Sequence, residues 1–113
     1  MESGNIDKKW FEVYCRQAAV SQAMAHPLRI AILNVLRQGP RCVQEIVQQV
    51  GGKQSNISRH LSVLVSAGIV QYEKKGLHVY YTIQRQCVLR FLDCLCDYLK
   101  EQIETDTKLL QII

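Results

Sequence analysis

The stretch Lys53-Gln-Ser-Asn-Ile-Ser-Arg-His-Leu-Ser-Val-Leu-Val-Ser-Ala67 decides the fold of this chain. It predicts one helix with two unlike faces. Its apolar residues recur at the i, i+4, i+7 and i+8 spacing of a buried stripe, and they are Ile57, Leu61, Leu64 and Val65. The opposite face holds Ser55, Arg59, Ser62 and Ser66. A solvated face usually pairs Glu with Lys, whereas small polar residues with one Arg and no acid can hydrogen-bond phosphates and base edges.

A Ser-rich surface helix is the alternative interpretation, and the neighbouring segments decide between the two. Residues 41–50 predict a short amphipathic helix, and Gly51-Gly52 predicts a tight turn into the helix that follows. A short helix, a glycine turn and a helix with one polar face are typical of a helix-turn-helix. We therefore assign residues 41–67 to that motif, after a core helix that begins at His26-Pro27.

Beyond the motif, the sequence period changes from helical to alternating. Gly68 predicts a helix end. Residues 70–72 and 77–83 are rich in the β-branched and aromatic residues that favour strands. Glu73-Lys-Lys-Gly76 between them predicts a turn. Residues 69–84 are therefore expected to form a hairpin with a basic tip.

Helices are also predicted near both ends, at 7–24 and 86–102, and each carries a wide apolar face. The first holds Trp10, Phe11, Tyr14 and Ala18. The last holds two adjacent stripes, which are Val88, Leu92, Leu95 and Leu99 beside Cys87, Phe91, Cys94 and Tyr98. This apolar surface exceeds what one small core can cover, so segments 1–25 and 85–113 are expected to form a homodimer interface.

Composition and charge indicate a single domain over residues 1–113 that meets a polyanion. Hydrophobic residues make up 48% of the chain, which is enough for a packed core. The net charge is +4, but residues 29–90 hold nine bases and two acids, while residues 91–113 hold two bases and five acids. A concentrated basic segment favours nucleic acid. No signal peptide or membrane-spanning run is evident, so a cytoplasmic location is expected.

No motif points to an enzyme. The sequence holds no nucleophile elbow, phosphate-binding loop, His-Glu-x-x-His or paired carboxylates, so we expect no catalytic activity.

Three stretches together resemble the ArsR/SmtB family of small bacterial repressors, over nearly the whole chain. They are His26-Pro-Leu-Arg-Ile-Ala-Ile-Leu33, Ser55-Asn-Ile-Ser-Arg-His-Leu61 with Ala67-Gly-Ile-Val70, and Gly76-Leu-His-Val-Tyr-Tyr-Thr-Ile83. The resemblance implies a mainly α winged helix-turn-helix with a small β-hairpin. It also implies a homodimeric, sequence-specific repressor that binds double-stranded operator DNA and leaves it when an effector arrives.

The DNA contacts implied for this sequence lie on the second helix of the motif and on the hairpin. The candidates are Lys53, Ser55, Asn56, Ser58, Arg59, His60, Ser62, Lys74 and Lys75. Arg59 is expected to contact a guanine or a phosphate. His60 lies at the flank of the apolar stripe, so a structural role is an open alternative for it.

Five cysteines are candidates for a metal or redox sensor, namely Cys15, Cys42, Cys87, Cys94 and Cys96. An odd count argues against a disulfide framework. Thiolates suit As(III) or soft divalent metals, and a site shared by Cys15 and Cys42 is one arrangement. Cys87 and Cys94 stand about 10.5 Å apart along a helix, so they need the dimer mate.

Three alternatives stay open. The cysteines can be small apolar packing residues. The protein can be a regulator without a metal effector. It can also be a winged-helix module that binds protein, although an acid-free helix face and a basic hairpin favour DNA.

Overall fold

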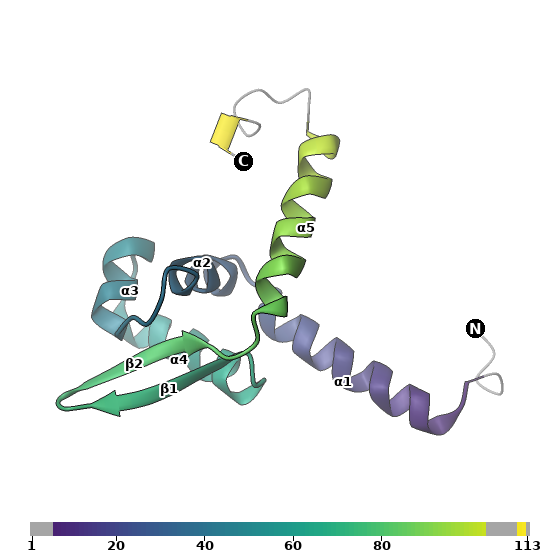
Figure 1. The fold of residues 1–113 in the computed structure, drawn as a ribbon, viewed down its shortest axis with the longest axis horizontal. Helices are drawn as coiled ribbons and strands as arrows, with labels where there is room; N and C mark the ends of the chain where they lie inside the picture. The colour runs from purple at the N-terminus through teal and green to yellow at the C-terminus, as the bar shows by residue number, and fades with distance from the viewer. Residues whose placement is uncertain (1–5, 104–110, 113) are drawn as a thin grey trace.

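The computed structural model describes residues 6–103 and 111–112, which contain five helices and one antiparallel hairpin (Figure 1). In chain order these are α1 (Lys8–Met24), α2 (Pro27–Leu36), α3 (Val43–Val50), α4 (Gln54–Ser66), β1 (Val70–Lys75), β2 (His78–Ile83) and α5 (Cys87–Gln102). The predicted fold class is confirmed. The predicted terminal segments extend into 1–5, 104–110 and 113, which lie outside the described residues.

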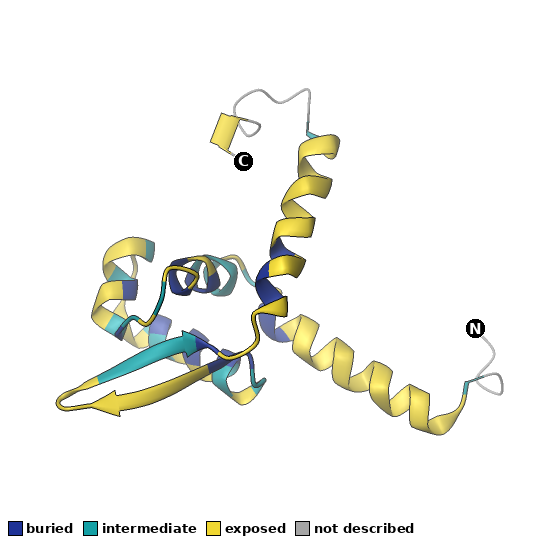
Figure 2. Cartoon of the chain, viewed as in Figure 1, coloured by how far each residue is buried: buried dark blue, intermediate teal, exposed yellow. Residues whose placement is uncertain are grey.

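The core lies where α2, α3 and α4 meet the base of the hairpin and the first turns of α5 (Figure 2). Its most deeply buried side chains, each at 0 or 1% exposure, are Ile32, Leu33, Ile46, Ile57, Leu61, Leu64, Ile69 and Val70. Three of the four residues predicted as the inner stripe of α4 are thus fully buried, and the fourth, Val65, is half-buried against the same cluster. The apolar spacing of α4 therefore sets its rotation about its own axis.

Gly68 ends α4 as the sequence predicted. Its φ of 77° lies in the left-handed region that a side chain disfavours. This geometry lets the Gly68 N–H donate to the Val65 carbonyl and the Ile69 N–H donate to the Leu64 carbonyl, each at 3.0 Å. That pair of bonds is the Schellman arrangement, which satisfies the last carbonyls and directs the chain into β1.

Two predicted boundaries are wrong. The third helix begins at Val43, because Arg41 instead exchanges two backbone hydrogen bonds with Tyr81, at 3.1 and 2.8 Å. The hairpin turn is Gly76-Leu77 rather than 73–76, because the ladder continues to the pair Lys75↔His78. Both lysines of the predicted turn are therefore strand residues.

The terminal helices α1 and α5 project from this body in different directions (Figure 1). Most of their surface is exposed, and only the last two residues of α1 and three residues of α5 are buried. The bidentate ion pair from Arg37 to Asp93, at 2.8 and 3.1 Å, ties α5 to the end of α2. Among the described residues, no helix has the length and apolar character to cross a membrane.

Candidate nucleic-acid interface

The outer face of α4 is open along its length. Ser55, Arg59 and Ser62 are exposed, while Asn56 and Ser58 are half-buried at its edges. The Ser62 hydroxyl donates to the Ser58 carbonyl at 3.1 Å. The lone pairs of Ser62 therefore stay available to accept from a partner, whereas its proton is engaged.

The N-terminus of α4 is unusual because Lys53 stands at the capping position. Helices usually begin with Ser, Thr, Asp or Asn, whose oxygen accepts from the first N–H groups. Lys53 is exposed and makes no side-chain capping bond, so the first turn of α4 keeps donors open to solvent. An uncapped helix start next to a lysine suits a phosphate, because the helix dipole and the N–H groups both favour an anion.

The one acid within the helix-turn-helix, Glu45, is engaged by its own helix. Its Oε1 accepts the backbone N–H of Cys42 at 3.1 Å. That bond lowers the pKa of Glu45, and the Cys42 thiol lowers it further. The Glu45 carboxylate therefore caps the N-terminus of α3.

His60 is the exception among the predicted contacts. The side chain is 7% exposed, and its Nδ1 accepts from Arg29 Nε at 3.1 Å. The His26 ring packs against it with centroids 4.4 Å apart, and Arg29 also donates to the Ala23 carbonyl at 3.3 Å. Burial lowers the pKa of His60, and His26, Arg29 and Arg59 lower it further. This placement corrects its assignment to the DNA contacts, because a buried ring that holds Arg29 is structural.

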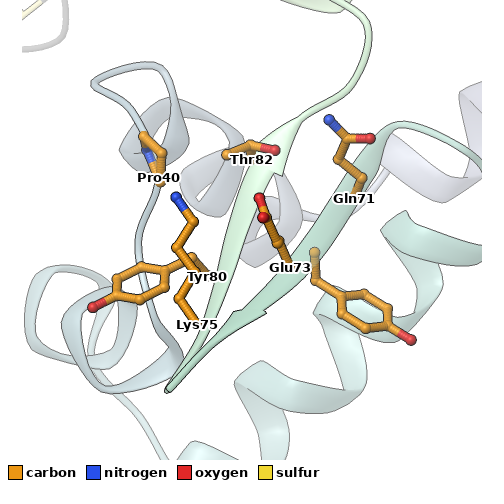
Figure 3. Close-up of a pocket in the computed structure, with 7 residues that line it drawn as sticks. Pro40, Gln71, Glu73, Lys75, Tyr80 and Thr82 are labelled. Carbon is orange, nitrogen blue, oxygen red and sulfur yellow. The ribbon is translucent and has the colours of Figure 1, made fainter. Parts of the chain in front are cut away.

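The two faces of the hairpin separate the two lysines that the sequence grouped together. The strand register places Lys74 on the face of buried Val70 and Ile83, which packs on the body of the domain. Lys75 lies on the opposite face, beside a shallow depression of about 260 Å³ whose lining includes Pro40, Gln71, Glu73, Lys75, Tyr80 and Thr82 (Figure 3). Lys75 therefore shares its face with an acid, and Lys74 does not.

Sequence reasoning missed Tyr72 as a candidate. By strand alternation Tyr72 lies on the same face as Lys74, its ring packs against Tyr81 at 5.9 Å, and it remains 61% exposed. β1 also packs against α4. An exposed phenol on a strand that packs against α4 can donate to a phosphate oxygen. The available signal was an aromatic residue on a strand two positions before a lysine.

Comparison with known proteins identifies the family. The model of the family "Bacterial regulatory protein, arsR family" matches residues 26–72. The uncharacterized HTH-type transcriptional regulator MJ1325 of Methanocaldococcus jannaschii is 37% identical over 73 residues, which cover 64% of this chain and 82% of that protein. The chain belongs to the ArsR family.

Two further proteins match over different lengths. The HTH-type transcriptional repressor SmtB of Mycobacterium tuberculosis is 42% identical over 62 residues, which cover 55% of this chain and 46% of that repressor. The match thus spans about half the length of that relative. The homodimeric winged helix-turn-helix DNA-binding domain of Mb0332 from Mycobacterium bovis superposes with a TM-score of 0.78 at 28% identity, over 89% of this chain and 94% of that domain.

The cysteines of this ArsR-family chain fall into two groups. Cys42 is buried at the start of α3, whereas Cys15, Cys87, Cys94 and Cys96 are exposed on α1 and α5. The structure does not bring Cys15 and Cys42 together within one protomer, because α1 leads away from α3 (Figure 1). Within residues 6–103 and 111–112, no three His, Cys, Asp or Glu side chains are grouped as metal ligands.

Proposed function

We propose that this ArsR-family protein is a homodimeric transcriptional repressor that binds operator DNA through α4 and the hairpin. The observation that carries the proposal is the exposed, acid-free face of α4, which begins at uncapped Lys53 and presents Arg59. In a two-fold dimer, the two copies of α4 would enter major grooves about 34 Å apart on one side of the duplex.

The exposed apolar faces of α1 and α5 support the dimer. Trp10 and Phe11 on α1 are 59 and 57% exposed, and Tyr98 and Leu99 on α5 are 56 and 46% exposed. Contiguous apolar surface of this kind is unfavourable in water and marks an interface in soluble proteins. The homodimeric domain from Mycobacterium bovis gives independent support.

Substitution of Arg59 tests the DNA-binding surface. A duplex is first selected from a random pool with the wild-type protein, and its affinity is then measured by fluorescence anisotropy. Arg59→Ala should weaken binding by about tenfold or more, because a lost bidentate contact costs about 1–3 kcal/mol. Arg16→Ala is the matched control, since Arg16 is an exposed arginine on α1 whose guanidinium pairs, among the described residues, with neighbouring Glu12 at 3.1 Å.

Two results would contradict the proposal. Failure of the pool to yield any duplex with salt-sensitive binding would remove DNA as the partner. Wild-type affinity in Arg59→Ala would show that α4 does not face the DNA in the orientation argued above.

The proposal extends to an effector, which is As(III), a soft divalent metal or an oxidant that acts on thiols and releases DNA. Support comes from the position of Cys15, Cys87, Cys94 and Cys96, all exposed on the helices proposed to form the dimer seam. Thiolates from two protomers can then meet at one soft ion.

The effector is tested by adding As(III), Cd(II), Zn(II) or an oxidant to the DNA complex of each Cys→Ser variant. Release should be lost in at least one variant of the four exposed cysteines. Cys42→Ser should respond as wild type, because its thiol is buried at the start of α3. An unchanged response in every variant excludes thiol sensing.

A further inference from the structure

The tip of the hairpin presents a single apolar side chain. Leu77 is 96% exposed, which is the highest value among the exposed large hydrophobic residues of the described chain. The other exposed apolar side chains on α1 and α5 have apolar neighbours on the same helix. Leu77 stands apart from both helices, at the far end of the hairpin (Figure 1).

The fold does not require a leucine at this position. The turn depends on Gly76, whose φ of 64° is positive, while no residue other than glycine has a positive φ in the described chain. A two-residue hairpin turn with a positive φ only at its first position is of type II′, and its second position accepts small polar residues. The exposed side chain of Leu77 therefore contributes little to the packing of the folded protein.

The surroundings of Leu77 are cationic. Lys74, Lys75 and His78 precede and follow the turn, and Glu73 is the single acid in the two strands, where it pairs with Tyr80. An apolar point beside two lysines fits a polyanion that can also offer an apolar surface. The faces of DNA bases, reached between stacked steps, combine both properties.

The hairpin has the reach for such a contact. Val70 and Ile83 are buried at its base, and β1 is exposed from Gln71 to Lys75. Five strand residues extend about 16 Å from the body. A minor groove about 6 Å wide admits the narrow turn but not the whole two-stranded ribbon, so the turn residues would be the part that enters.

We propose that Leu77 enters the minor groove beside the major-groove site of α4 and wedges into one base step. This inference rests on the DNA binding proposed above and adds to it a determinant of specificity without hydrogen bonds. Pyrimidine–purine steps unstack most easily, so the preferred operators would carry a TA or CA/TG step at that position. The step would be kinked towards the major groove.

The experiment uses the full-length protein and the selected duplex, with 2-aminopurine placed in turn at each step of the flanking minor groove. Wild-type protein should raise the fluorescence at one step, because unstacking relieves quenching of the probe. Leu77→Ala should abolish that rise and weaken binding by about tenfold, the worth of a partly buried leucine. The salt dependence should not change, because no charge is lost.

Leu77→Met is the matched variant, because methionine also acts as an apolar wedge and should retain the fluorescence rise. Replacement of the TA or CA/TG step by a GC step should weaken wild type but not Leu77→Ala. If wild type binds the duplex with no fluorescence change at any step, or Leu77→Ala binds as wild type does, the wedge is refuted while DNA binding stands. If wild type binds no duplex at all, the proposed function itself fails.

Discussion

At the scale of single residues, His60 links α4, the helix proposed to bind DNA, to the rest of the domain. Arg29 donates to His60 Nδ1 and to the Ala23 carbonyl, so one side chain of α2 connects α4 with the last turn of α1. Because Nδ1 accepts, the ring is neutral and carries its proton on Nε2. Protonation at Nδ1 would remove the acceptor and place a second charge beside Arg29.

The hydrogen bond from Arg29 to His60 predicts that the protein loses stability in mild acid. Burial lowers the pKa of His60 from 6.5, so the unfolded chain binds a proton more readily than the folded chain does. Its contribution to stability is therefore complete above pH about 6.5 and falls as the pH drops below that value. Thermal melting followed by circular dichroism should show a lower Tm at pH 5 than at pH 7.5.

His60→Asn is the control for this prediction, because the Asn oxygen occupies nearly the place of Nδ1 and does not titrate. The fall in Tm between pH 7.5 and pH 5 should be smaller in that variant. An equal fall in both proteins would show that the pH dependence does not come from His60.

The same residue shows the limit of sequence reasoning at this scale. Positions 57, 60, 61 and 64 all fit one helical face, so the spacing alone allows His60 in the core. Its hydrogen-bond donor is Arg29, which lies 31 positions away. A buried imidazole is stable only when its nitrogen has a hydrogen-bond partner. A single sequence does not reveal which residue is that partner.

At the scale of elements, the two faces of the hairpin predict unequal roles for its lysines. Lys74 shares the body-side face with Tyr72, whereas Lys75 shares the outer face with Glu73. Lys74→Ala should weaken DNA binding and reduce the salt slope by about one unit per protomer, since one phosphate contact is lost. Lys75→Ala should weaken DNA binding less and reduce the salt slope by a smaller amount.

The measurement is anisotropy of the selected duplex in a series of KCl concentrations, with each variant beside the wild type. Lys100→Ala on α5 is the control, because that lysine lies in the last turn of a terminal helix. Equal changes in slope for Lys74→Ala and Lys75→Ala would contradict the assignment of faces.

The hairpin also separates what an alternating pattern can predict from what it cannot. The alternating period of residues 77–83 puts Val79, Tyr81 and Ile83 on one face, which agrees with the register of the observed ladder. The turn was misplaced because Glu-Lys-Lys-Gly has the polar composition of a loop. Cross-strand pairing carries both lysines into the ladder, and pairing is a property of two segments together.

At the scale of the whole molecule, the charge distribution and the apolar faces were readable from the sequence. The basic segment 29–90 contains α4 and the hairpin, and the acidic segment begins within α5. The exposure of the five thiols was not readable. Cys42 is buried directly after Arg41, whose backbone pairs with the distant Tyr81, and the local sequence does not show that pairing. Local sequence predicts which face of a helix or strand is apolar or basic. Pairing between segments that are distant in sequence determines which of these faces are buried.

Those uncovered faces predict that DNA affinity depends on dimerisation. Leu95 on α5 is 40% exposed and belongs to the apolar face that we propose to lie in the seam. Leu95→Asp places a charge there without opening a cavity in the protomer core, so the helical circular dichroism should persist while sedimentation shows a monomer. Affinity for the selected duplex should fall by more than about tenfold, because the second α4 no longer binds in the same complex.

Arg90→Asp is the matched control, since Arg90 is exposed on the same helix and lies away from the apolar stripe. This variant should remain a dimer in sedimentation and bind DNA with a change much smaller than that of Leu95→Asp. The steepness of the binding curve against protomer concentration separates a loss of dimerisation from a loss of DNA contacts. A monomer that dimerises only on DNA gives a steeper curve than a preformed dimer. A Leu95→Asp protein that sediments as a dimer would place the interface on other surfaces of α1 and α5.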